Sequence, residues 1–379
     1  MREQLRVRER QPEREQRFQD YEWDEIRSRD IAARRRIVKE RPRVAKYDSV
    51  PWEQSQSAYH KVYTTYDLPT AERKPWTVLM NNLRLLVQTF DPGHKTANHR
   101  HYPEVPFFVL QGKGHEIHDG RRHDWEAGDL MIVPPYCTHQ HFCDEGPALL
   151  VYCQHNYTAI SDGSEKLEIN ENWVLPDDSR PLYNQQGTLV GYRRGEQDFL
   201  FVETTLSDRM AQRMLEEPPK PDHPITDSYE YYVRQFEEER YWRQNVPQVV
   251  KQRDRMWEDT RNGRTLWFLH PQLPQMQTGM RLFEAYLQEL PPGGRSGKHL
   301  HVGEELHFII EGTGYDVIDG QRWDWEAHDV VAVPTLAPHQ SFNADPDHPA
   351  RFLVYKSRLY DYLSFSGIEH FEDASGNAQ

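Results

Sequence analysis

The sequence predicts a mainly β protein built from two antiparallel barrels, with a helical N-terminal arm and a helical segment between the barrels. Three observations favour this fold. The stretch from His99 to Phe142 recurs at His299 to Phe342 without insertion, and nineteen of its positions are identical. Each copy contains short apolar runs bounded by turn residues, which is typical of antiparallel barrels. Outside the copies, charged and aromatic residues mix with good helix formers.

The expected strands follow one another at short spacing in each copy. Asp-Gly dipeptides mark hairpins between them, and the buried-type runs end at Gly-x-Gly or at proline. The paired runs are 107–110 with 307–310 and 130–133 with 330–333, and the paired hairpins are 119–120 with 319–320. The repeat begins before the histidines, because Met80 to Gly93 matches Met280 to Gly293. After Phe142 an insertion shifts the match, and we align Leu150 to Tyr152 with Leu353 to Tyr355.

These boundaries divide the chain into four parts. Residues 1–50 form a charged helical arm, 51–160 the first barrel, 161–265 a linker with helices, and 266–379 the second barrel. Acidic and basic residues are interspersed along the arm, so a role in oligomerisation or domain packing is favoured over nucleic-acid binding.

Composition narrows the range of partners. The 379 residues carry a net charge of −14, which disfavours nucleic acid and anionic membrane surfaces as partners. We therefore expect the partner to be a small molecule. Three cysteines are too few for a disulfide framework across the chain, and no apolar run is long enough to span a bilayer. We therefore expect a soluble, cytoplasmic protein.

Each copy places two histidines at alternate positions of one strand and a third about forty residues later. Alternate residues of a strand share a face, so His99 with His101, and His299 with His301, aim at one barrel interior each. His139 and His339 supply the third ring. Three imidazoles are a common ligand set for divalent transition metals and leave coordination positions open for a substrate or dioxygen.

The two copies differ at one candidate ligand. Glu305 can complete a site with three histidines and one carboxylate, whereas Val105 occupies the equivalent position of the first copy. Glu104 and Glu304 are adjacent, but side chains alternate across a strand, so we interpret both as non-ligands. Cys137 and Cys143 lie near His139 and could also be metal ligands, but the second copy has no counterparts, which disfavours this role.

The motif His299-x-His301-x3-Glu305, followed by Pro334 and His339, resembles the signature of the cupin superfamily, and its duplication resembles a bicupin. The resemblance implies two jelly-roll barrels. With His139 and His141 near the end of the first copy, the chain is similar to the gentisate 1,2-dioxygenase group, which includes salicylate and 1-hydroxy-2-naphthoate dioxygenases. These are Fe(II) enzymes that cleave aromatic rings with O2.

The resemblance implies roles residue by residue. His99, His101 and His139 fall on iron ligands, His141 on an acid/base histidine and Gln88 on a substrate-side glutamine. Phe107 stands where the group has an arginine for the substrate carboxylate, which indicates a differently substituted phenol. The alternative role for His141 is that of a polar residue at the barrel mouth. The alternative role for Gln88 is structural, because Gln288 occupies the equivalent position of the second copy.

The resulting hypothesis is a homo-oligomeric Fe(II)-dependent ring-cleaving dioxygenase that takes a hydroxylated aromatic substrate and O2. Manganese or another divalent metal is the alternative cofactor, above all at His299, His301, Glu305 and His339, which could form a second catalytic centre or a structural site. The alternative functions are a manganese oxalate decarboxylase or oxidase and a non-catalytic small-molecule-binding bicupin.

Overall fold

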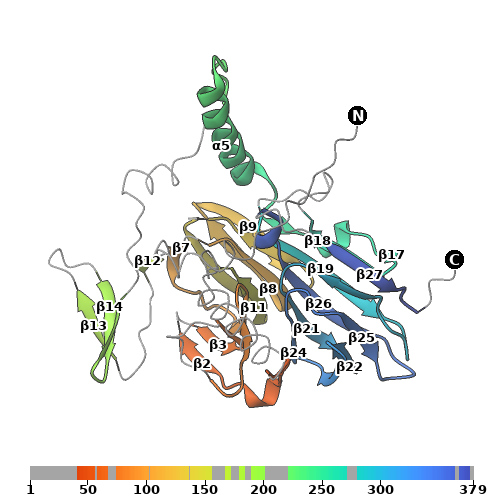
Figure 1. Cartoon of the computed structure of the whole chain (residues 1–379). Helices are drawn as coiled ribbons and strands as arrows, with labels where there is room; N and C mark the ends of the chain where they lie inside the picture. Colours follow the sequence, from red (N-terminus) through yellow and green to blue (C-terminus); the bar gives the residue numbers. More distant parts are fainter. Residues whose placement is uncertain are drawn as a thin grey trace, which may run out of the picture. The chain divides into compact units, whose positions relative to one another are not determined.

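The computed structural model describes residues 41–55, 58–66, 74–101, 103–135, 137–155, 167–171, 179–183, 189–200, 221–270, 280–362 and 367–375. The predicted helical arm lies outside these residues up to position 40. Within them the chain is mainly β, as predicted, and the strands form two domains that correspond to the two sequence copies (Figure 1).

The first domain is organised on a ten-stranded sheet whose main path runs β16-β10-β8-β11-β6-β3-β2, with β7, β9 and β12 attached to it. Its strands are β2 (Glu53–Ser55), β3 (Ala58–Val62), β6 (Arg84–Phe90), β7 (Asn98–His101), β8 (Val105–His118), β9 (Arg121–Glu126), β10 (Leu130–Val133), β11 (His139–Gln154), β12 (Leu167–Glu171) and β16 (Val249–Val250).

The second domain has a seven-stranded sheet, β1-β24-β21-β26-β19-β18-β17, and a five-stranded sheet, β23-β22-β25-β20-β27. The first contains β1 (Val44–Ala45), β17 (Glu258–Thr260), β18 (Gly263–Leu269), β19 (Phe283–Leu290), β21 (Glu305–Glu311), β24 (Val330–Val333) and β26 (Ala350–Ser357). The second contains β20 (Lys298–His301), β22 (Thr313–Ile318), β23 (Gln321–Glu326), β25 (His339–Asn343) and β27 (Ile368–Glu372).

The remaining described elements are small or lie between the domains. β4 (Thr64–Tyr66) pairs in parallel with β5 (Val78–Met80). In the predicted linker, β13 (Ser179–Tyr183), β14 (Leu189–Arg194) and β15 (Gln197–Leu200) form a separate sheet, and α5 (Ser228–Asn245) is the helix. The helical turns are η1 (Tyr47–Ser49), η2 (Gln252–Asp254) and α6 (Leu359–Tyr362). None of the helices in the described residues combines the length and apolar character needed to cross a bilayer.

Central strands are buried on both faces because the two domains share a core. On β6, Leu85 and Val87 join a cluster that contains residues of both domains, while Leu86 and Phe90 face the interior of the first domain. On β19, Ala285 and Leu287 belong to the shared cluster in the same way. Alternation along each strand thus separates a shared core from each domain's own interior.

Each domain also receives a short strand from the segment that precedes the other domain. β1 lies before the first domain but pairs with β24 of the second, and β16 lies before the second domain but pairs with β10 of the first. Matching ion pairs fix the two exchanged strands, since Lys46 lies 2.7 Å from Asp329 and Lys251 lies 2.6 Å from Asp129.

Two buried carboxylates cross between the domains. Glu304 accepts hydrogen bonds from the backbone N–H groups of Asn81 and Asn82, both at 2.7 Å, and Glu104 accepts from those of Arg281 and Leu282, the latter at 2.6 Å. Each glutamate therefore holds the segment that leads into the other domain's β6 or β19. Burial raises the pKa of Glu304, although the backbone donors favour its ionised form. We call these two residues the interdomain carboxylates.

The alignment of Leu150 to Tyr152 with Leu353 to Tyr355 was wrong by one residue. Gln88 pairs with Leu150 and Gln288 with Phe352, so the shift after the insertion is one residue smaller than the apolar triplets suggested. Because a slip of one residue exchanges the two faces of a strand, the wrong alignment assigned equivalent environments to residues that lie in different cores. Tyr152 faces the interior of the first domain, whereas Tyr355 lies in the shared core.

Candidate metal centres

Three histidines converge in the interior of the first domain. His99 and His101 come from β7, and His139 begins β11 with its Cα paired to that of His99. All three are buried, and one ligand atom from each lies within 4.8 Å of the others. The structure therefore brings together the three residues predicted as iron ligands.

Backbone carbonyls fix the orientation of these rings. Each Nδ1 faces a carbonyl two residues away: Ala97 O at 3.0 Å for His99, Pro103 O at 2.8 Å for His101 and Cys137 O at 3.0 Å for His139. A ring whose Nδ1–H donates to a carbonyl keeps its Nε2 lone pair for a metal. Nε2 of His139 is buried and has no hydrogen-bond partner among the described residues, as expected of a ligand atom.

Burial keeps the rings neutral. It lowers the pKa of His99 to about 3 and that of His101 to about 4, and it holds the pKa of His139 well below its usual range. Metal binding requires neutral imidazole, so this cluster is ready for a divalent cation at neutral pH. Burial also raises the pKa of the Cys137 thiol well above its usual range, and neither Cys137 nor Cys143 belongs to the cluster.

A second layer of polar side chains holds His141 beside the cluster. Nδ1 of His141 donates to Glu116 Oε1 at 2.6 Å, and the other oxygen of Glu116 contacts His118. His118 in turn contacts Gln248, which immediately precedes the exchanged strand β16. Burial alone would raise the pKa of Glu116, but the two histidines lower this pKa far below its usual range. Glu116 is therefore ionised although it is buried.

The other predicted residues of the first site lie on the same interior surface. Phe107 stacks on Tyr152 with ring centroids 4.6 Å apart, and its centroid is 4.7 Å from that of His141. Gln88 shares the inward face of β6 with Leu86 and Phe90. Gln288 instead donates to Asn262 O at 2.6 Å, which gives the second copy a structural glutamine.

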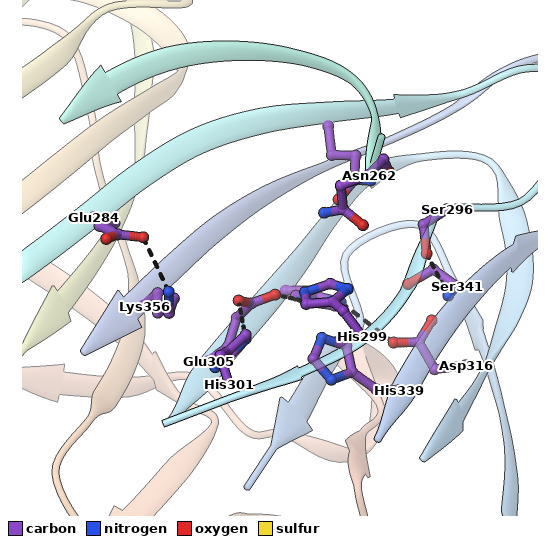
Figure 2. A network of polar contacts seen from close by, with 12 residues as sticks. Asn262, Glu284, Ser296, His299, His301, Glu305, Asp316, His339, Ser341 and Lys356 are labelled. Atoms are coloured by element: carbon purple, nitrogen blue, oxygen red, sulfur yellow. Dashed lines mark hydrogen bonds and ion pairs between the residues drawn. The ribbon is translucent and has the colours of Figure 1, made fainter. Parts of the chain in front are cut away.

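The second domain repeats the cluster with His299, His301 and His339 (Figure 2). Their Nδ1 atoms face the carbonyls of residues 297, 303 and 337, and Nε2 of His339 is buried without a hydrogen-bond partner among the described residues. Burial lowers the pKa of His299 to about 4 and that of His339 well below its usual range. These features fit a divalent metal as well as those of the first domain.

Glu305 reaches this cluster through one ring. Its Oε2 lies 2.9 Å from His301 Nε2, and its Oε1 accepts from His307 Nε2 at 2.6 Å. Burial opposes ionisation of both groups, but the histidines hold the pKa of Glu305 well below its usual range, and Asp316 and Glu305 raise the pKa of His307 to about 10.

Sequence reasoning missed Glu116, His118, Gln248 and His307. One signal was present for the acid: Glu116 and Asp316 keep an acidic side chain at the same offset, on strands whose neighbouring inward positions are buried. Gln248 gave no such signal, since it lies 130 residues from His118 in sequence.

Comparisons with known proteins agree with this architecture. The family profile of the Cupin domain matches residues 86–153 and 286–355, so the chain contains two cupin domains of jelly-roll type and is a bicupin. Among the curated proteins, no sequence matches the chain.

Solved structures of other bicupins resemble the chain at low sequence identity. A mutant of oxalate decarboxylase from Bacillus subtilis has 14% identity and a TM-score of 0.52, with 87% of this chain and 80% of that chain covered. Salicylate 1,2-dioxygenase from Pseudaminobacter salicylatoxidans has 15% identity and a TM-score of 0.48, with 76% and 75% covered. At these identities the likeness concerns the fold alone.

Proposed function

We propose that the chain is an Fe(II)-dependent ring-cleaving dioxygenase that acts on a hydroxylated aromatic compound of the gentisate or salicylate kind in its first domain. The observation that carries this proposal is the cluster of His99, His101 and His139, with three neutral rings, beside His141 on its buried carboxylate. A site of neutral ligands keeps the full positive charge of the cation, which favours a chelating, anionic phenol.

The side chains divide the work between holding the metal and handling the substrate. His99, His101 and His139 would hold ferrous iron, which supplies a Lewis-acidic cation for the substrate oxygens and the electrons that activate O2. Because Nδ1 of His141 donates to Glu116, its Nε2 is left to accept the phenolic proton and return it later. Phe107 and Tyr152 offer an apolar wall to an aromatic ring, and Gln88 offers an amide on the same surface.

The second domain supports a second candidate function. Glu305, whose carboxylate contacts His301, would complete the three-histidine cluster with one carboxylate, and such a ligand set favours manganese and an oxalate decarboxylase or oxidase. The fold is shared with oxalate decarboxylase from Bacillus subtilis. We place the chemistry in the first domain because the second domain has Ser341 at the position of His141. The serine hydroxyl cannot replace an imidazole as an acid/base group, although Asp316 keeps the acid at the position of Glu116. A cytoplasmic location and a homo-oligomeric state stay predictions.

Oxygen consumption distinguishes the two candidates. The protein is loaded anaerobically with Fe(II) or Mn(II) and assayed on an oxygen electrode against gentisate, salicylates, hydroxynaphthoates and catechols, and separately against oxalate. We expect Fe(II)-dependent O2 uptake with one class of phenol and a ring-opened product that carries both atoms of labelled O2. Release of CO2 from oxalate without net O2 uptake, and no turnover of the phenols, would overturn the proposal.

A further inference from the structure

A chain of four buried side chains starts at the histidine cluster of the second domain. It begins at His301, whose Nε2 lies 2.9 Å from Glu305 Oε2, and continues from Glu305 Oε1 to His307 Nε2 at 2.6 Å. His307 Nδ1 then makes an ion-pair contact with Asp316 Oδ2 at 3.3 Å. Every member is at most 3% exposed, and Figure 2 shows Glu305 next to His301.

The far end of this chain is anchored in the domain's own core. Asp316 Oδ1 accepts a hydrogen bond from Trp325 Nε1 at 2.8 Å, and Trp325 packs in the apolar cluster of the second domain. Asp316 therefore cannot turn away from His307 without losing a buried donor, which is costly. His307 is also stacked on Phe352, with ring centroids 4.9 Å apart, so its ring plane is fixed.

The two oxygens of Glu305 consequently have separate partners. The bond from His307 holds Oε1 and leaves Oε2 facing His301. A glutamate without that bond has three rotatable side-chain torsions and could move its carboxylate away from the rings. Partners that hold ligand side chains in this way commonly change metal affinity about 10- to 100-fold when they are removed.

The first domain provides a natural comparison. Val105, Phe107 and Glu116 occupy the positions of Glu305, His307 and Asp316. There the acid at the third position holds His141 and His118 instead. The same framework thus serves two different tasks. It holds a histidine beside the cluster in the first domain and a carboxylate beside the cluster in the second.

We propose that His307 is a positioning residue that holds Glu305 as the fourth protein ligand of a divalent cation, so that the second domain retains its metal far longer than the first. This inference rests on the metal sites of the proposed function and is independent of ring cleavage. The second domain would then carry the permanent metal, and the first domain, with three neutral ligands, the exchangeable one.

Metal retention tests the inference without any substrate. The experiment uses the full chain with His99→Ala, which disrupts the first cluster and leaves the second intact. This protein is loaded with Co²⁺, desalted and exposed to excess EDTA. Co²⁺ per chain is followed in time by mass spectrometry, together with the visible absorption spectrum of the bound ion. The same measurement is made after adding His307→Phe, His307→Gln, Asp316→Asn or Glu305→Ala. His307→Phe introduces the residue of the first domain, whereas glutamine keeps a donor for Glu305.

We expect His307→Phe to release Co²⁺ at least about 10-fold faster and to change the spectrum, because an oxygen ligand is lost. Asp316→Asn should act in the same direction, and His307→Gln should stay within about threefold of the parent. Thermal unfolding of the metal-free proteins verifies that each variant folds. Should His307→Phe and Asp316→Asn retain Co²⁺ like the parent, or His307→Gln lose it as fast as His307→Phe, the positioning role is wrong. If Glu305→Ala also retains Co²⁺ unchanged, Glu305 is no ligand and the proposed second metal site itself fails.

Discussion

The Glu116 carboxylate lies 2.6 Å from Nδ1 of His141, inside the first domain and beside the three-histidine cluster. Since the neighbouring histidines lower the pKa of Glu116 despite its burial, the acid is ionised and accepts a hydrogen bond from the Nδ1–H group of His141. This pair fixes both the tautomer and the direction of the ring that we assign to proton transfer.

Glu116→Gln tests the pair directly. The amide keeps the shape of the side chain but removes the charge that orients His141, so kcat with the phenolic substrate should fall about 10- to 100-fold while KM changes little. Steady-state oxygen-electrode kinetics measure both constants. Metal content is the control, because Glu116 does not touch the three ligands and iron per chain should be unchanged. Unaltered kcat at full iron content would show that His141 does not need Glu116.

The interdomain carboxylates should contribute strongly to stability. Glu304→Ala strands two backbone N–H groups and an asparagine amide, and we expect the free energy of unfolding to fall by about 3 kcal/mol. Glu104→Ala is the matched variant on the other side. Urea unfolding measures the change, and by calorimetry we expect one transition for the parent and two for the variant. A loss below about 1 kcal/mol would mean that water replaces these bonds.

Stability should fall with acid because buried histidines stay neutral in the folded chain. His155, whose Nε2 contacts Ser357 Oγ at 2.8 Å, has its pKa lowered by burial from 6.5 to about 4. Between these values the unfolded chain binds a proton that the folded chain does not, so this contribution is complete above pH 6.5 and is lost as the pH falls toward 4.

His155→Gln isolates this contribution, because glutamine can keep the bond to Ser357 without titrating. The dependence of the unfolding free energy on pH, measured with urea between pH 6.5 and pH 4.5, should be shallower in the variant by up to one proton. His60, whose pKa burial also lowers to about 4, remains in both proteins and shares the background slope. Identical slopes would show that His155 is charged in the folded state or that its environment opens in acid.

The sequence predicted the features that depend on local pattern. Two histidines at alternate positions of a strand must share a face, and the hairpin signals placed His139 on a neighbouring strand, so the clusters followed from spacing alone. The fold followed from the repeat. The adjacent glutamates, predicted as non-ligands by alternation, do face away and bind the other domain's backbone.

The features that were not predicted depend on long-range pairing. Val249 and Val250 form a strand of two residues whose partner, β10, lies about 120 residues earlier, and no periodicity of two residues can indicate such an exchange. Gln248 reaches His118 for the same reason. The register of Tyr152 was missed because an insertion separates matching strands, and identity of apolar residues does not distinguish the two faces.

The most direct test of the account compares the two clusters within one chain. O2 uptake is measured with the phenolic substrate and saturating Fe(II) for His99→Ala, for His299→Ala and for the parent, with iron per chain determined in parallel. We predict that His99→Ala lowers the rate at least about 100-fold, while His299→Ala retains most of the activity at the temperature where it is folded. Loss of activity in His299→Ala, with His99→Ala tolerated, would place the oxygen chemistry in the second domain and contradict the account.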